Sequence, residues 1–249
     1  MLPWAFSVML LTVRLGVALA LSPALASYGV PAMVRIALTV ALAVLAFADR
    51  APAPAVANWL ATPSAVITPV LAEVFTGALL GLGVQVLFGA LALAGRLMDV
   101  QIGFAIGSVF DPVSRSGSSV LGSLMSLIGI TLFVLSNAHL ELAQLVSASI
   151  DLLPLGQMPA LHDPMQPLLA AGSMFALGLA FAGPVAVALL LTDVTIAVAS
   201  RNMPQLNVLV LAIPLKVIVG YLVLAIAISG WGPLMQQALR QAVTVLETH

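Results

Sequence analysis

Long apolar runs alternate with short polar or proline-containing breaks along this chain. The runs over residues 3–21, 31–48, 67–110, 119–137, 168–199 and 205–228 predict about six hydrophobic helices arranged in hairpins. Most of them approach or exceed the about 20 residues that a helix needs to cross the hydrocarbon core of a bilayer. The pattern therefore predicts an all-α membrane protein, and we expect residues 1–249 to form a single domain.

Proline and glycine positions refine these elements. The run over residues 67–110 is too long for one span, which predicts two helices or one bent helix. Gly183-Pro184 predicts a kink in the fifth helix, and four prolines predict an irregular loop over residues 153–167. Residues 140–153 and the tail after residue 233 show amphipathic spacing, which predicts a short C-terminal amphipathic helix in the tail.

Small residues recur at helical spacing in the third run. Gly77 and Gly81 form a small-xxx-small pair, and Gly103 and Gly107 repeat it. Such pairs let another helix approach closely, so we expect these glycines to pack against helices.

Charged residues are rare, and several lie inside apolar runs. Of the chain, 62% is hydrophobic and 7% charged, and the charges within runs include Arg14, Glu73, Asp193 and Lys216. A lone ion at the centre of a membrane helix costs roughly 2.5 to 3.5 kcal/mol, so each should face protein, water or a partner charge. Arg96 and Asp99 stand three residues apart, a spacing that permits a local ion pair.

A polar elbow separates the last two long helices. It contains Arg201, Pro204, Gln205 and Asn207, and Pro204 predicts that one helix ends and the next begins there. Asp193 and Lys216 each lie roughly ten residues from this tip, so they fall at similar heights of an antiparallel pair. We expect the two charges to pair with each other or with a neighbouring subunit.

Composition excludes several classes of function. A net charge of −1 offers no basic face for nucleic acid, and the absence of cysteine excludes disulfides and thiolate metal sites. The three histidines show no metal-ligand spacing. The first apolar run of the chain ends in Ala24-Leu25-Ala26, a pattern that fits a signal-peptide cleavage site. Arg14 lies inside that run, where a signal peptide should carry no charge, so a retained first helix is favoured.

Three segments resemble one known family. The run R-N-M-P-Q-L-N-V over residues 201–208, with P-L-K-V-I-V-G over 214–220, is similar to the C-terminal signature of the flagellar biosynthetic protein FliR family. The run V-P-A-M-V-R-I-A-L over residues 30–38 resembles its N-terminal part. The stretch from Ala94 to Pro112, which ends in Phe-Asp-Pro, resembles its central segment. The family includes a virulence counterpart, SctT.

The resemblance implies a non-enzymatic component of the type III protein export gate. It implies one copy assembled with several copies of FliP and FliQ, FlhB around the entrance, unfolded flagellar proteins as cargo, and no cofactor. It also implies a multi-pass protein of the bacterial inner membrane in the flagellar basal body, in contact with lipid. In relatives the loop after the central segment helps to plug the closed pore, which assigns that role to Phe110, Asp111, Pro112, Ser114 and Gly117.

An alternative is a small-molecule or ion transporter. Arg14, Glu73, Asp193 and Lys216 would then be pathway groups beside helices broken at proline. An intramembrane aspartyl protease is weaker, because no motif recommends a carboxylate pair. The sequence shows no convincing pair of repeated halves, whereas segments similar to the export family occur near both ends and in the middle. The pore component is therefore favoured.

Overall fold

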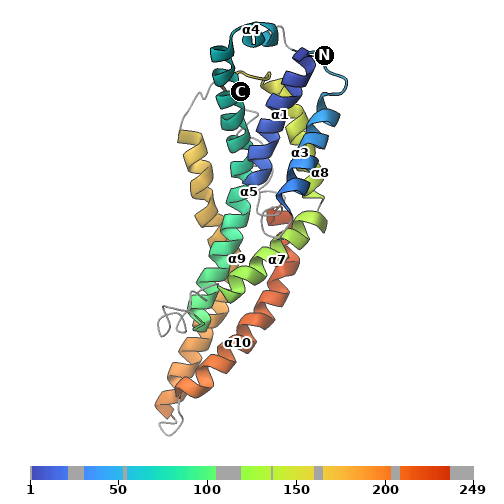
Figure 1. The fold of residues 1–249 in the computed structure, drawn as a ribbon. Helices are drawn as coiled ribbons and strands as arrows, with labels where there is room; N and C mark the ends of the chain where they lie inside the picture. The colour runs from blue at the N-terminus through green and yellow to red at the C-terminus, as the bar shows by residue number, and fades with distance from the viewer. Residues whose placement is uncertain are drawn as a thin grey trace. The chain divides into compact units, whose positions relative to one another are not determined.

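The computed structural model describes residues 2–21, 31–52, 55–104, 119–135, 137–159, 165–202 and 208–235, and most of these residues are helical. These ranges contain no β-strand (Figure 1). In chain order the elements are α1 (Leu2–Ala20), α3 (Ala32–Phe47), α4 (Ala55–Ala61), the 3₁₀ turn η1 (Pro63–Val66), α5 (Ile67–Ile102), α7 (Val120–Leu135), α8 (Ala138–Leu152), α9 (Met165–Asn202), α10 (Val208–Ala227) and the 3₁₀ turn η2 (Ile228–Gly230). The predicted all-α class is confirmed.

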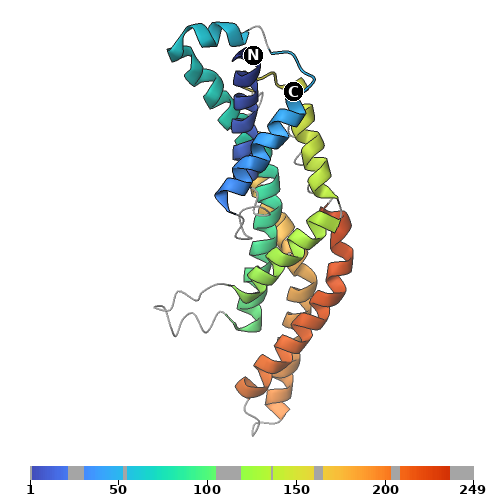
Figure 2. The same ribbon diagram turned by 45° about the vertical axis from the view of Figure 1, so that its right-hand side comes forward.

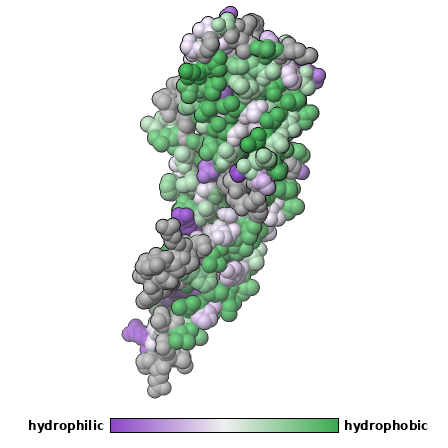
Figure 3. Space-filling view, viewed as in Figure 1, coloured by the Kyte–Doolittle hydropathy of each residue, from purple (hydrophilic) through white to green (hydrophobic). Residues whose placement is uncertain are grey.

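Several helices are suited to a membrane. Four stretches of the described chain are long and apolar enough to cross a bilayer, namely Leu2–Ala20, Ser64–Ile102, Ala171–Asn202 and Val210–Met235. Apolar side chains also make up much of the coloured surface on the face seen in Figure 3. A soluble domain would hide most of such surface, so length, composition and exposure together identify an all-α membrane protein.

The third apolar run forms one helix rather than two. α5 continues for 36 residues, and its proline, Pro69, lies in the first turn, where no intrahelical donor is needed. The helix ends where Gly103 adopts a φ of 100°, a conformation that glycine accepts without steric cost. The alternative of two helices in this run is therefore wrong.

The fifth helix is also longer than the sequence predicts. α9 runs for 38 residues through Gly183 and Pro184, and it begins at Met165 inside the segment expected to be an irregular loop. Pro167 falls in the first turn, where proline is tolerated, and the helix continues through Pro184, the position of the predicted kink. α10 likewise continues through Pro214.

One compact unit contains α1, α3, α4, the part of α5 up to Val86, and α8. α1, α3 and α8 lie side by side in both ribbon views (Figures 1 and 2). Their apolar faces form a common core of Val8, Leu10, Leu11, Leu15, Ala43, Phe47, Val146, Ile150 and Leu155. Arg14 and Glu73 are buried within the same unit.

The second compact unit contains the part of α5 from Leu87, α7, the part of α9 from Gly172, and α10. α9 and α10 run side by side as an antiparallel pair (Figures 1 and 2). Aromatic pairs stabilise the unit: the rings of Phe88 and Phe133 are 5.9 Å apart, and those of Phe181 and Trp231 meet edge to face at 5.3 Å.

Candidate functional site

The first unit contains a fully buried ion pair. Arg14 on α1 donates from Nε to Glu73 Oε2 on α5 at 2.6 Å and from Nη2 to Glu73 Oε1 at 3.1 Å. Both side chains are 0% exposed. This bidentate arrangement is the geometry in which a guanidinium binds a carboxylate most strongly.

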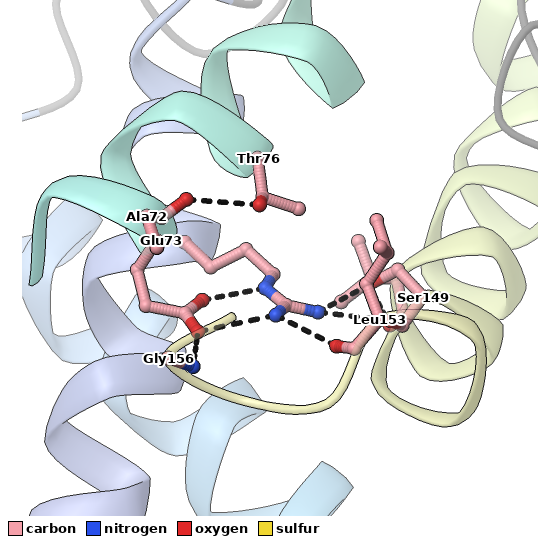
Figure 4. A network of polar contacts seen from close by, with 8 residues as sticks. Ala72, Glu73, Thr76, Ser149, Leu153 and Gly156 are labelled. Carbon is pink, nitrogen blue, oxygen red and sulfur yellow. Dashed lines mark hydrogen bonds and ion pairs between the residues drawn. The ribbon is translucent and has the colours of Figure 1, made fainter. Parts of the chain in front are cut away.

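Backbone groups and one serine hydroxyl complete the network around this pair. Arg14 Nη1 donates to the carbonyl oxygen and hydroxyl of Ser149, and Nη2 donates to the carbonyl of Leu153. The amide of Gly156 donates to Glu73 Oε1 at 2.6 Å. Figure 4 shows Glu73 on one side of the guanidinium, with Ser149 and Leu153 on the other. Since these bonds engage all five guanidinium N–H donors, the network joins α1, α5 and the end of α8 and leaves no donor for a ligand.

The turn after α8 follows from one glycine. Gly156 has a φ of 77°, which favours glycine, and a Cβ there would collide with the ring of Trp59. The turn brings the Gly156 amide to Glu73, so the loop supplies a donor that neither helix provides. Sequence reasoning named Arg14 and Glu73 but did not pair them, since 59 residues separate them.

In the second unit Asp193 and Lys216 meet across α9 and α10. Lys216 Nζ lies 2.5 Å from Asp193 Oδ1, in agreement with the pairing that their positions permit. Lys216 also donates to the carbonyl of Gln101 in the last turn of α5 at 3.1 Å. The position of Asp193 inside an apolar run also predicts a buried charge, which is wrong within the single chain: its side chain is 52% exposed, against 17% for Lys216.

Asp99 has a different partner from the one its spacing suggests. It is 5% exposed, and its described bonds go to the start of α7 rather than to Arg96. Ser119 donates its hydroxyl to Asp99 Oδ2, and the amide of Leu121 donates to Oδ1 at 3.1 Å. The local pair that the spacing to Arg96 permits is therefore replaced by a long-range helix cap, which sequence spacing alone does not reveal.

The glycine pairs have different roles. A Cβ at Gly77 would collide with the carbonyl of Arg14, and one at Gly81 would lie 2.9 Å from Leu21 Cβ, so this face of α5 packs closely on α1. Gly103 directly follows the last residue of α5, and its φ of 100° ends that helix. Sequence reasoning missed Gly95, where the backbone of α7 at Gly122 approaches closely enough to exclude any Cβ.

Other predicted residues lie outside the described part of the chain. They are the plug-loop residues Phe110, Asp111, Pro112, Ser114 and Gly117, the elbow residues Pro204, Gln205 and Asn207, the packing residue Gly107, and the C-terminal amphipathic helix. Arg201 is described: it is exposed in the last turn of α9, where its positive charge interacts favourably with the helix dipole. The described ranges contain no group of three His, Asp or Glu side chains that could hold a metal ion.

Comparisons with known proteins agree with the segments that suggested a family. The profile of a family described as “Bacterial export proteins, family 1” matches residues 5–242. The flagellar biosynthetic protein FliR of Escherichia coli strain K12 is 28% identical over 232 residues, covering 90% of this chain and 85% of that protein. The Bacillus subtilis strain 168 protein of the same name is 28% identical, covering 89% and 85%.

A relative from a virulence system is also similar. The Yop proteins translocation protein T of Yersinia pestis is 31% identical over 157 residues, which cover 62% of this chain and 60% of that protein. The family match extends over nearly the whole sequence, including both compact units and the polar networks within them. The chain therefore belongs to family 1 of the bacterial export proteins.

Proposed function

We propose that this protein is a non-enzymatic component of the type III protein export gate of the bacterial flagellum. One observation carries the proposal: relatives named flagellar biosynthetic protein FliR match about nine tenths of the chain. The relatives named for flagellar biosynthesis and Yop translocation support protein export over the small-molecule carrier considered above.

The arrangement of charge is consistent with a structural subunit. Arg14 and Glu73 are saturated by each other and by backbone groups, and Lys216 is bound to Asp193 and Gln101. Such groups stabilise helix contacts, whereas a transport or catalytic group must exchange partners during its cycle. The whole chain, on this proposal, acts as one subunit.

Neighbouring subunits would cover the apolar faces that the single chain leaves open. On α9 and α10 these faces expose Val187, Leu190, Leu191, Val194, Val198, Val210, Leu211, Ile218, Leu222 and Ile226. We propose FliP, FliQ and FlhB as the partners, membrane lipid at the remaining surface, and the inner membrane of the flagellar basal body as the location. Unfolded flagellar proteins are the proposed cargo. The loop from Phe110 to Ser119 is the proposed plug of the closed channel.

Virulence secretion is the second candidate, because the Yersinia relative has the higher identity over a shorter part of the chain. The flagellar assignment is preferred because the flagellar relatives cover more of it.

Co-expression tests the assembly. This chain should co-purify with FliP and FliQ from the same genome, and native mass spectrometry should detect a complex containing all three. The counterparts from a virulence operon of that genome, where it has one, serve as the competing partners. A chain that stays alone, or that selects the virulence set, would contradict the flagellar proposal.

A further inference from the structure

The carboxylate of Asp99 caps a helix to which it does not belong. The first N–H groups of a helix have no intrahelical acceptor, and α7 begins at Val120. Asp99 Oδ1 accepts the N–H of Leu121, and Oδ2 accepts the hydroxyl of Ser119. The Ser119 hydroxyl in turn accepts the N–H of Gly122 at 2.7 Å. An anionic acceptor at this end also interacts favourably with the helix dipole.

The same residue closes the end of its own helix. The backbone carbonyl of Asp99 accepts the N–H of Gly103 at 3.1 Å, and Gly103 has the positive φ that ends α5. One residue thus bonds to the chain on both sides of residues 104–118: with its carbonyl before this segment and with its carboxylate after it.

Two further contacts hold this junction within the second unit. The backbones of α5 and α7 meet at Gly95 and Gly122 without room for a side chain. Lys216 binds the carbonyl of Gln101, two residues beyond Asp99, and adds a positive charge at the C-terminal end of α5. These contacts keep the last turns of α5 close to α7, so the Asp99 carboxylate lies within reach of the start of α7.

We propose that Asp99 is a positioning residue that holds the two ends of the segment between α5 and α7 together. The proposal rests on the proposed function, in which that segment includes the plug of the channel. A cap that served only α7 would add stability to one helix. A tie between both ends also fixes the point from which the plug extends, so its loss should change the closed state of the channel at unchanged complex levels.

Spin labels measure the tie directly. The chain has no cysteine, and Val100 and Val120 are exposed near the end of α5 and the start of α7. Cysteines at these two positions, labelled in the complex with FliP and FliQ, should give one narrow distance peak by double electron–electron resonance. Asp99→Ala should broaden or shift that peak. Asp99→Asn retains an acceptor oxygen, so it should change the peak less than Asp99→Ala does. It replaces the alanine variant in this measurement if that variant fails to assemble.

Bilayer conductance measures the consequence, with K⁺ as the permeant ion. Asp99→Ala and Ser119→Ala should raise the leak of the closed complex, by about tenfold for Asp99→Ala, as expected when a charged hydrogen bond is lost. Arg96→Gln is the control, because Arg96 is exposed one turn earlier on the same helix, and it should leave both the distance peak and the leak unchanged.

The outcomes separate this proposal from the proposed function. An unchanged distance peak in both Asp99 variants would overturn the tie. The positioning role would be overturned if the Asp99 variants change the distance peak but do not leak, while a complex whose loop is shortened between Ser114 and Ser118 does leak. If the shortened loop does not leak either, the plug assignment fails, while the distance peak still decides whether Asp99 joins the two ends.

Discussion

Arg14 and Glu73 form an ion pair that is closed to solvent and bonded at every guanidinium N–H. Arg50 and Asp151, in the same compact unit, form a second ion pair, in which Arg50 Nη2 donates to both carboxylate oxygens at 2.8 Å and 3.0 Å, but the Asp151 side chain is 68% exposed. Both are arginine–carboxylate pairs, but the first is fully buried and the second is largely exposed. Their comparison shows how much more a buried pair contributes to stability than an exposed one.

Removing one charge of the buried pair should destabilise the protein strongly. Arg14→Gln or Glu73→Gln leaves an unpaired buried charge, which costs about 3–5 kcal/mol, whereas the double variant should lose less than the sum of the two. Arg50→Gln is the matched control and should cost about 0–1 kcal/mol. Denaturant unfolding in detergent measures these values. Equal losses at the two pairs would show that burial does not govern them.

Substitutions at the contact of α5 with α1 should be costly. Gly81→Leu forces a branched side chain against Leu21 and the carbonyl of Ala18, so it should reduce unfolding stability by about 1–3 kcal/mol and lower the yield of the assembled complex. Gly172→Ala is the control, because a Cβ there meets nothing within 4 Å, and alanine favours a helix over glycine by about 1 kcal/mol. Native mass spectrometry of co-expressed subunits measures assembly. An unchanged complex with Gly81→Leu would contradict the packing role.

The helical class could be predicted because apolar runs and proline breaks act locally. The start of α3 after Pro31 and the end of α5 before Gly103 follow from the backbone chemistry of proline and glycine. The spacing of Gly103 to Gly107 had suggested a packing role instead. The proline at Pro184 removes one backbone donor, and α9 nevertheless continues past it as one helix.

Long-range partners could not be predicted in the same way. Arg14 and Glu73 stand out as charges in apolar runs, but only the folded chain brings Ser149 and Gly156 to them. Asp99 had a plausible local partner in Arg96, yet its carboxylate accepts a hydrogen bond from a backbone amide at the start of α7. No rule of sequence spacing predicts this partner, because the amide belongs to a different helix. Asp193 and Lys216 were the exception, because α10 begins only six residues after the last residue of α9, which limits their register.

The pair between α9 and α10 should behave as one unit in function. Asp193→Asn or Lys216→Gln leaves the other charge without its partner, so each should reduce motility more than the double variant does. Swarm diameter on soft agar at matched protein levels measures this. Thr195→Ala, an exposed change on the same helix, is the control and should retain motility. Additive losses in the double variant would argue against direct pairing in the assembled gate.

Shortening the loop from Ser114 to Ser118 should open a leak without stopping export. If the loop occludes the channel, its removal opens a path that does not depend on the energy source of export. Ion conductance in bilayers and cell sensitivity to small solutes measure the leak, at complex levels matched to the unaltered chain. Shortening by the same number of residues in the tail after residue 242, beyond the family match, is the control. Unaltered permeability would leave the loop as an ordinary connection.

Secretion of flagellar proteins tests the central claim most directly. The gene for this chain is deleted in its own bacterium, and flagellar subunits in the culture medium are quantified against those inside the cells, with and without a plasmid copy. The account predicts that the subunits accumulate inside, that the medium contains almost none, and that the plasmid copy restores both. Normal flagellar secretion in the deletion strain would contradict the account, whether or not other transport across the membrane changed.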